Sequence, residues 1–217
     1  MEIFIDTARI DEIKQAMDWG VCDGVTTNPS WIARDGAGKK TFKQVVMEIC
    51  EVVPGPVSAE AVSLSAEGMV KEAEEIASWA KNIVVKIPLT EEGIKATKIL
   101  TEKGIKTNLT LVHSANQAIL AAKVGATYVS PFMGRFFDSG MDGLQLVEDI
   151  IEIYRIQGFK TKVLAASYRT PFEISEAAKM GVDVVTIKFE YLKKMFHHPY
   201  TDAGLKTFLE DWKKVPK

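Results

Sequence analysis

The chain has few residues suited to metal or redox chemistry. Its two cysteines, Cys22 and Cys50, stand outside any CxxC or Cys/His spacing, so we expect both to be reduced packing residues. Its three histidines, His113, His197 and His198, show no HExxH or other metal-binding spacing and are expected on the surface or in loops. The sequence therefore predicts a protein without a metal site or a bound cofactor.

The sequence also lacks an excess of charge of one sign and any long apolar run. Lys and Arg number 27 and Asp and Glu number 29, with both signs scattered along the chain, which disfavours a nucleic-acid partner. No run of about 18 apolar residues occurs, and the N-terminus shows no basic region followed by an apolar stretch. These absences predict a soluble, cytoplasmic protein without a membrane partner, in which local groups would hold any anionic ligand.

What the chain does contain is a regular alternation of strand-like and helical segments. Eight short apolar runs are expected as strands, near residues 2–6, 23–28, 57–62, 82–87, 105–111, 126–132, 162–167 and 182–187. Eight segments have helical periodicity, near residues 9–19, 41–52, 67–80, 91–103, 114–123, 142–157, 171–179 and 189–196. This alternation calls for parallel strands with right-handed crossovers, so it predicts an α/β protein with a single (β/α)8 barrel domain over residues 1–217.

An open doubly wound sheet is the alternative fold. It is disfavoured because no predicted strand is followed by GxGxxG, and the glycine-rich residues 36–40 fit neither a Rossmann nor a P-loop spacing. We interpret residues 36–40 as a solvated loop.

Helix start signals support several of these boundaries. Residues 170–173, Thr-Pro-Phe-Glu, combine a capping threonine, a proline at the first helical position and a glutamate, and thus predict a capping box. Residues 114–117, Ser-Ala-Asn-Gln, predict a second one. Residues 202–214 predict a ninth, amphipathic helix beyond what the barrel needs. Its apolar stripe consists of Leu205, Phe208, Leu209 and Trp212.

Polar residues recur near the carboxyl end of almost every predicted strand. Residues that are two apart in a strand share a face. The pairs that share a face in this way are Asp6 with Phe4, Thr26 with Asn28, Glu60 with Ser58, Lys86 with Val84, Asn108 with Thr110, Ser130 with Phe132, and Ser167 with Ala165. The alternate residues, which include Leu111, Leu164 and Ala166, are apolar and suit a face covered by helices. The polar set is therefore predicted to face the barrel lumen, at the strand ends where barrel enzymes build their sites.

Lys86 is the most unusual of these residues, because four aliphatic residues accompany it in the segment 83–87. Taking an ammonium out of water is costly, so a lysine here tends to release its proton and become a nucleophilic amine. Alternatively, its side chain could extend past Pro88 to solvent. With Asp6 and Glu60 on other strands, the residues favour Schiff-base chemistry. In that chemistry the amine attacks a ketone, one carboxylate moves protons and the other activates water.

Simpler roles exist for two residues of the polar set. Asp6 could cap a helix that starts near Ala8, and Asn28 before Pro29 is a plausible N-cap. Glu60 has no such simple role, because a carboxylate within a parallel strand is covered on one face and crowded on the other.

Two arginines follow the sixth and seventh predicted strands. Arg135 lies shortly after the sixth, and Arg169 follows Ser167 immediately before the helix start at Thr170. Guanidinium groups and helix N-termini both favour phosphate, which the late loops of such barrels often hold. These residues therefore predict a phosphate site.

At these residues the chain resembles the transaldolase family, in particular the short subfamily that includes fructose-6-phosphate aldolases. The matching segments span nearly the whole length, at residues 4–8, 23–29, 84–88, 107–110, 128–132, 134–135 and 165–167. The resemblance implies a (β/α)8 barrel in which Lys86 forms the Schiff base. It also implies a homo-oligomer, as a ring-like assembly of five or ten chains.

The resemblance further implies roles for the other residues. Asp6 would be the acid/base that deprotonates the C4 hydroxyl, and Glu60 with Thr110 would hold the catalytic water. The sugar phosphate would be bound through its dihydroxyacetone unit by Asn28, Asn108 and Ser130, and through its phosphate by Arg135, Ser167 and Arg169, with Thr26 and Phe132 also facing it.

Two positions favour group transfer over simple cleavage. Transaldolases resemble this chain in having Glu60 and Phe132, where the aldolase branch tends to have glutamine and tyrosine. The resemblance therefore implies transfer of a dihydroxyacetone group from a ketose phosphate to an aldose phosphate in the pentose phosphate pathway. An aldolase that releases free dihydroxyacetone is the alternative. The intact set of Lys86, Asp6 and Glu60 argues against a third possibility, a non-catalytic sugar-phosphate binder.

Overall fold

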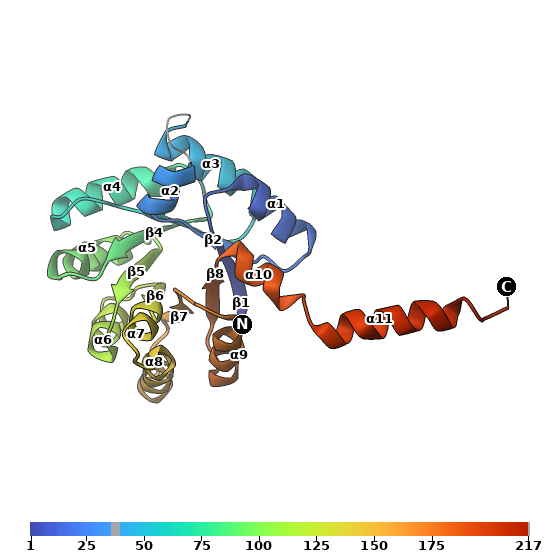
Figure 1. The fold of residues 1–217 in the computed structure, drawn as a ribbon. Coiled ribbons are helices and arrows are strands. Elements are labelled where there is room, and N and C mark those ends of the chain that lie inside the picture. The colour runs from blue at the N-terminus through green and yellow to red at the C-terminus, as the bar shows by residue number, and fades with distance from the viewer. Residues whose placement is uncertain (36–39, 217) are drawn as a thin grey trace.

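Eight parallel strands form a closed barrel in which each strand pairs with the next and β8 pairs with β1 (Figure 1). The structure is a computed structural model that describes residues 1–35 and 40–216. The strands are β1 Glu2–Asp6, β2 Gly24–Thr26, β3 Val57–Glu60, β4 Ile83–Pro88, β5 Thr107–Val112, β6 Tyr128–Pro131, β7 Lys162–Ala165 and β8 Val184–Ile187. The predicted (β/α)8 barrel is confirmed, and closure of β8 on β1 rules out the open sheet.

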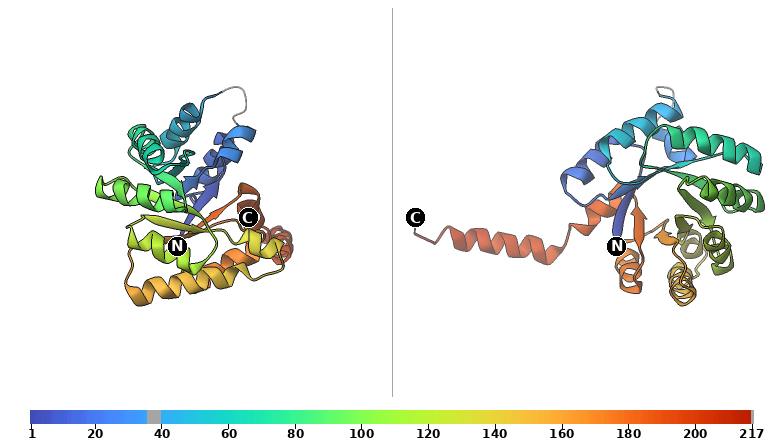
Figure 2. Two further views of the ribbon diagram at one scale, coloured as in Figure 1. Left: turned by 90° about the vertical axis from the view of Figure 1, so that its left-hand side faces the viewer. Right: turned by 180° about the vertical axis from the view of Figure 1, so that it is seen from behind.

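Helices surround the barrel, and those expected between its strands are all present (Figure 2). They are α1 Ile10–Asp18, α2 Pro29–Asp35, α3 Phe42–Val52, α4 Ala66–Ser78, α5 Glu91–Glu102, α6 Ala115–Lys123, α7 Gly134–Asp138, α8 Gly143–Gln157, α9 Pro171–Met180, α10 Phe189–Met195 and α11 Pro199–Trp212. The short helices α2 and α7 were not predicted. Helix α2 lies between β2 and α3, and helix α7 lies between β6 and α8. Residues 36–39, most of the expected solvated loop, lie outside the described residues.

The expected capping boxes form only in part. At α6 the Ser114 hydroxyl accepts the backbone N–H of Gln117 at 3.2 Å, as expected. The Gln117 side chain, however, accepts the backbone N–H of His113 at 2.7 Å and not that of Ser114. At α9 the Thr170 hydroxyl donates to Glu173 at 3.1 Å, and Glu173 accepts the backbone N–H one residue before Thr170 at 2.7 Å. In both helices the N3 side chain accepts the backbone N–H of the residue before the N-cap and not the backbone N–H of the N-cap itself.

The barrel interior is apolar in its lower part and polar toward the carboxyl ends of the strands. The apolar lumen cluster consists of Phe4, Val84, Tyr128, Leu164 and Val184, all at most 5% exposed. The residues next to them in sequence, such as Ile5, Val85 and Val129, belong instead to the core between sheet and helices. This alternation confirms the predicted faces of β1, β4 and β6.

The predicted faces were wrong at the ends of two strands. In β7, Leu164 and Ala166 face the lumen side and Ala165 packs with the helices, the reverse of the expectation. Ser167 still lines the site, because its φ of 68° is left-handed and breaks the alternation. Leu111, expected beneath helices, is 46% exposed with a φ of 59°, at an irregularity in the pairing of β5 with β6. At Leu111 and Ser167 a left-handed backbone conformation therefore breaks the alternation of side chains between the two faces of the strand.

The predicted ninth helix is present as α11, which projects away from the barrel (Figure 1). None of its residues is buried. The four residues of the apolar stripe are 55–73% exposed: Leu205, Phe208, Leu209 and Trp212. The stripe is therefore uncovered within the described part of the chain. Among the described residues, no helix combines the length and apolarity needed to cross a membrane.

Gly93 allows α5 to approach the end of β4, the strand that carries Lys86. A Cβ at Gly93 would lie 2.0 Å from the carbonyl oxygen of Pro88, so Gly93→Ala must displace the strand end or the helix. We expect Gly93→Ala to lower the free energy of unfolding by about 1–3 kcal/mol, measured by thermal or urea unfolding. The matched control is Gly204→Ala in α11, where nothing beyond the neighbouring residues and the backbone of the same helix lies within 4 Å of the added Cβ. Equal stability of the two variants would contradict this close packing.

Candidate active site

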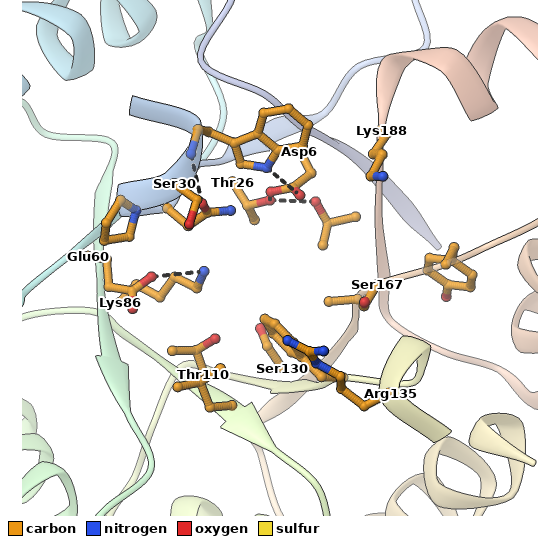
Figure 3. Close-up of a pocket in the computed structure, with 18 of the residues that line it drawn as sticks. Asp6, Thr26, Ser30, Glu60, Lys86, Thr110, Ser130, Arg135, Ser167 and Lys188 are labelled. Atoms are coloured by element: carbon orange, nitrogen blue, oxygen red, sulfur yellow. Dashed lines mark hydrogen bonds and ion pairs between the residues drawn. The ribbon is translucent and has the colours of Figure 1, made fainter. Parts of the chain in front are cut away.

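A cavity of about 700 Å³ opens at the carboxyl ends of the strands (Figure 3). Eleven of the twelve predicted site residues line it: Asp6, Thr26, Asn28, Glu60, Lys86, Thr110, Ser130, Phe132, Arg135, Ser167 and Arg169. The twelfth, Asn108, is fully buried and does not line the cavity. The volume suits a small organic ligand. The barrel thus gathers side chains from strands far apart in the sequence into one site.

Lys86 lies buried in this cavity beside Glu60. The two residues occupy paired positions of β4 and β3, and Lys86 Nζ lies 3.1 Å from Glu60 Oε2. Lys86 Nζ also donates to the Thr27 carbonyl oxygen at 3.3 Å, and it lies 5.8 Å from the centre of the Phe132 ring. The Lys86 side chain is only 6% exposed, so the alternative that it extends past Pro88 to solvent is wrong.

Asp6 is held by two hydrogen bonds at the end of β1. Thr26 Oγ1 donates to Asp6 Oδ1, and the indole Nε1–H of Trp31 donates to Asp6 Oδ2, both at 2.8 Å. The Thr26 and Thr186 hydroxyl oxygens lie 2.6 Å apart. Because the Thr26 proton goes to Asp6, Thr186 must donate to Thr26. Asp6 does not cap α1, since the N-cap of that helix, Arg9, has no side-chain cap bond.

Asn28 does act as a helix cap. Its Oδ1 accepts the backbone N–H of Trp31 at 3.0 Å, at the start of α2, which confirms the capping interpretation. Beneath the cavity, Asn108 donates from Nδ2 to Ser58 at 3.3 Å and accepts the Ser130 hydroxyl at 2.7 Å. These bonds fix the orientation of the Asn108 amide and of the Ser130 hydroxyl.

Thr110 carries a hydroxyl without a hydrogen-bond partner among the described residues. The side chain lines the cavity and is 1% exposed, and its Oγ1 is fully buried. Buried polar groups are nearly always hydrogen-bonded in folded proteins. The Thr110 hydroxyl is therefore positioned to bind a water molecule or a ligand within the cavity.

Arg169, which also lines the cavity, is held in a fixed plane by Asp138 at the end of α7. Arg169 Nε and Nη2 donate to the two Asp138 oxygens at 3.0 and 2.7 Å, and Nη1 donates to Ser167 Oγ at 3.2 Å. Hydrogen bonding to Arg169 lowers the pKa of the Asp138 carboxyl below its ordinary value. Gly134 permits this packing, since a Cβ there would lie 2.4 Å from both Ser167 Oγ and Arg169 Nη1.

Arg135 brings a second guanidinium to the cavity (Figure 3). It is exposed and forms no side-chain hydrogen bond or ion pair with another described residue. Arg135 and Arg169, with the Ser167 hydroxyl, can together receive a phosphate group.

Six further polar or aromatic residues line the cavity and were not predicted as site residues from the sequence. They are Ser30, Trp31, Arg34, Tyr168, Thr186 and Lys188. A signal existed for the last two, because the period of two in β8 places both on the lumen face with Val184. Trp31 and Arg34 lie three apart on the short helix α2, which the Asn28 cap and Pro29 could have indicated.

The two cysteines pack against the apolar cores and the three histidines lie outside helices and strands, as predicted from the sequence. Cys22 and Cys50 are free thiols that pack against the apolar cores, and burial raises the pKa of each to about 11. Among the described residues, no group of three or more His, Cys, Asp and Glu side chains is arranged to hold a metal ion.

Residues 3–217 match the family described as transaldolase/fructose-6-phosphate aldolase. The chain is 58% identical to a probable transaldolase of Kosmotoga olearia, over all of this chain and 98% of that protein. It is 54% identical to a probable transaldolase of Caldicellulosiruptor saccharolyticus, over all of this chain and 99% of that protein.

A more distant solved structure shares the fold. The thiamine phosphate pyrophosphorylase of Pyrococcus furiosus superposes with a TM-score of 0.58 at 16% identity, covering 86% of this chain and 85% of that one. At that identity the likeness bears on architecture alone. The full-length match to the family and to its members carries the assignment: the chain belongs to the transaldolase/fructose-6-phosphate aldolase family.

Proposed function

We propose that the protein is a transaldolase that moves a dihydroxyacetone group between sugar phosphates through a Schiff base on Lys86. The donor would be sedoheptulose 7-phosphate or fructose 6-phosphate, and the acceptor glyceraldehyde 3-phosphate or erythrose 4-phosphate, as in the pentose phosphate pathway. The observation that carries the proposal is the buried Lys86 with its Nζ 3.1 Å from Glu60, in a polar cavity at the carboxyl ends of the strands.

Imine formation would begin when Lys86 Nζ attacks the C2 carbonyl carbon of the ketose. The Glu60 carboxylate can take the proton that the ammonium must lose first, because it lies within hydrogen-bonding distance. Loss of water from the carbinolamine then gives the imine. Glu60 and the Thr110 hydroxyl, which has no hydrogen-bond partner in the described part of the chain, would hold that water and later return it for hydrolysis.

Cleavage would use Asp6. Its carboxylate removes the proton of the C4 hydroxyl, the C3–C4 bond breaks, and the bonding electrons move to C3 as the imine becomes an enamine. The aldose phosphate leaves. An acceptor aldehyde is then attacked by C3, and Asp6 returns the proton to the new hydroxyl before water releases the product ketose.

Substrate binding would divide between the two sides of the cavity. Asn28 and Ser130 are proposed to bind the dihydroxyacetone unit, whereas Asn108, which lies beneath the cavity, would act by orienting the Ser130 hydroxyl that it accepts. Arg135, Ser167 and Arg169 would bind the phosphate. Thr26 would contribute mainly through Asp6, to which its hydroxyl donates.

Phe132 supports transfer over release of free dihydroxyacetone. Its ring centre lies 5.8 Å from Lys86 Nζ, and a phenyl ring has no hydroxyl to donate a proton to the enamine or to orient water beside it. The enamine can then persist until an acceptor aldehyde enters, because it must gain a proton at C3 before it can be hydrolysed and Phe132 supplies none. Fructose-6-phosphate aldolase activity is the competing function.

Assembly into a homo-oligomer of five or ten chains is part of the proposal. The exposed apolar stripe of α11 supports it, because an apolar face of this kind needs cover that the described chain does not provide.

Borohydride trapping tests the nucleophile. With fructose 6-phosphate, reduction should attach a three-carbon adduct to Lys86 in the unmodified protein, as located by mass mapping of peptides. Lys86→Arg keeps a buried positive charge but offers no amine of comparable nucleophilicity, so no adduct should form. Lys188→Arg, at the cavity rim, is the matched control and should still be trapped. An adduct on a lysine other than Lys86 would overturn the assignment.

Product ratios with and without acceptor test the reaction type. The unmodified protein should consume fructose 6-phosphate slowly unless erythrose 4-phosphate or glyceraldehyde 3-phosphate is present. Phe132→Tyr adds a proton donor near the enamine, so release of free dihydroxyacetone relative to transfer should rise. Phe136→Tyr, on α7 and outside the cavity lining, is the control. Equal cleavage rates with and without acceptor in the unmodified protein would favour the aldolase.

Truncation tests the role of α11. Deleting residues 202–217 removes the apolar stripe and should reduce the particle mass measured by light scattering. Lys206→Ala, on the same helix but outside the stripe, should leave the mass unchanged. An unaltered mass after truncation would show that α11 does not hold the assembly together.

A further inference from the structure

Trp31 binds two residues of the site through its two N–H groups. Its indole Nε1–H donates to Asp6 Oδ2 at 2.8 Å, and its backbone N–H donates to Asn28 Oδ1 at 3.0 Å. The ring is partly buried and packs against the apolar cluster formed by α1, β2 and α3. The Arg34 guanidinium carbon lies 3.9 Å from the ring centre, on its face. Trp31 is therefore held from several sides before any substrate enters.

The hydrogen bonds of Asp6 define how its carboxylate is presented to the cavity. A carboxylate has about four lone-pair positions on its two oxygens. Thr26 occupies one on Oδ1 and Trp31 occupies one on Oδ2, so one position on each oxygen stays available for a substrate hydroxyl. Two donors on different oxygens also fix the carboxylate plane, which a single donor would leave free to rotate. In Figure 3, Asp6 and Thr26 lie side by side at the edge of the open space of the cavity.

We propose that Trp31 is a positioning residue that orients Asp6 for proton transfer. The inference rests on the acid/base role of Asp6 given under the proposed function. Trp31 acts through Asp6 and forms no hydrogen bond with Lys86 or Glu60 among the described residues. The cleavage step should therefore depend on the indole N–H, whereas imine formation on Lys86 should not.

Trp31→Phe separates the hydrogen bond from the packing, because phenylalanine retains an aromatic ring and lacks the N–H. We expect the turnover number for cleavage to fall by about 10- to 100-fold, the range for loss of a hydrogen bond to a charged group. KM for the sugar phosphate and the rate of borohydride-trapped imine formation should stay near their unmodified values. A loss confined to KM, or an equal loss in imine formation, would overturn the proposal.

The same substitution elsewhere in the chain gives a matched control. Trp79 has a buried indole N–H without a hydrogen-bond partner among the described residues, and it does not line the active-site cavity. Trp79→Phe should leave cleavage at the unmodified rate. If Trp79→Phe slowed cleavage as much as Trp31→Phe does, loss of indole packing and not of the Asp6 bond would explain both.

A double-mutant cycle links the effect to Asp6. In the Asp6→Asn background the acid/base is already absent, so adding Trp31→Phe should cost much less than it costs in the unmodified protein. The same fold loss in both backgrounds would show that Trp31 acts independently of Asp6 and would overturn the inference.

A spectroscopic measurement tests the bond without relying on activity or on folding of Trp31→Phe. In protein with nitrogen-15-labelled tryptophan, Asp6→Asn should move the Trp31 indole N–H resonance and leave that of Trp79 in place. An unmoved Trp31 resonance would show that no such bond forms.

The turnover of Asp6→Asn and of Trp31→Phe distinguishes a failure of the proposed function from a failure of the role of Trp31. If Asp6→Asn keeps full turnover, the acid/base role of Asp6 fails and the role of Trp31 falls with it. If Asp6→Asn is slow while Trp31→Phe turns over at the unmodified rate, only the role of Trp31 fails.

Discussion

The site depends on the buried ion pair between Lys86 and Glu60. A charged side chain taken out of water loses hydration worth several kcal/mol, and only an opposite charge with good hydrogen bonds offsets that loss. Parallel pairing of β3 with β4 sets the two residues opposite each other, with Lys86 Nζ 3.1 Å from Glu60 Oε2, and the Thr27 carbonyl accepts a further bond. Removing Lys86 or Glu60 alone would leave the other charge uncompensated. The groups proposed for catalysis therefore also stabilise the interior of the barrel.

The Lys86–Glu60 ion pair can exist because the barrel lumen is divided into an apolar layer and a polar layer. Below it, large apolar side chains such as Phe4 and Tyr128 fill the barrel and meet edge to face, with ring centres 6.1 Å apart. Above it, hydroxyl, amide and charged groups line the open cavity. The apolar layer fills the amino end of the barrel, so Lys86 and Glu60 face the polar cavity at the carboxyl ends of the strands. The barrel therefore separates the part that stabilises the fold from the part that can bind a ligand.

The two short helices at the cavity rim perform parallel tasks. Trp31 on α2 donates to Asp6 across 25 residues of sequence, and Asp138 on α7 accepts from Arg169 across 31. Each helix follows a strand end and carries a side chain that fixes a charged group supplied by another strand or loop. The groups proposed for proton transfer and for phosphate binding are thus both oriented before substrate arrives, which lowers the ordering that binding must impose.

The sequence by itself determined the eight strands, the long helices and most of the polar residues of the site, because these features follow from local periodicity. Lys86 was identifiable since an ammonium among aliphatic neighbours is unusual wherever the strand pairs. Tertiary structure decided the departures from period two at Leu111 and Ser167, where a left-handed backbone breaks the alternation of faces. It also decided the partners of Trp31 and Arg169, because those contacts join residues that only barrel closure and loop packing bring together.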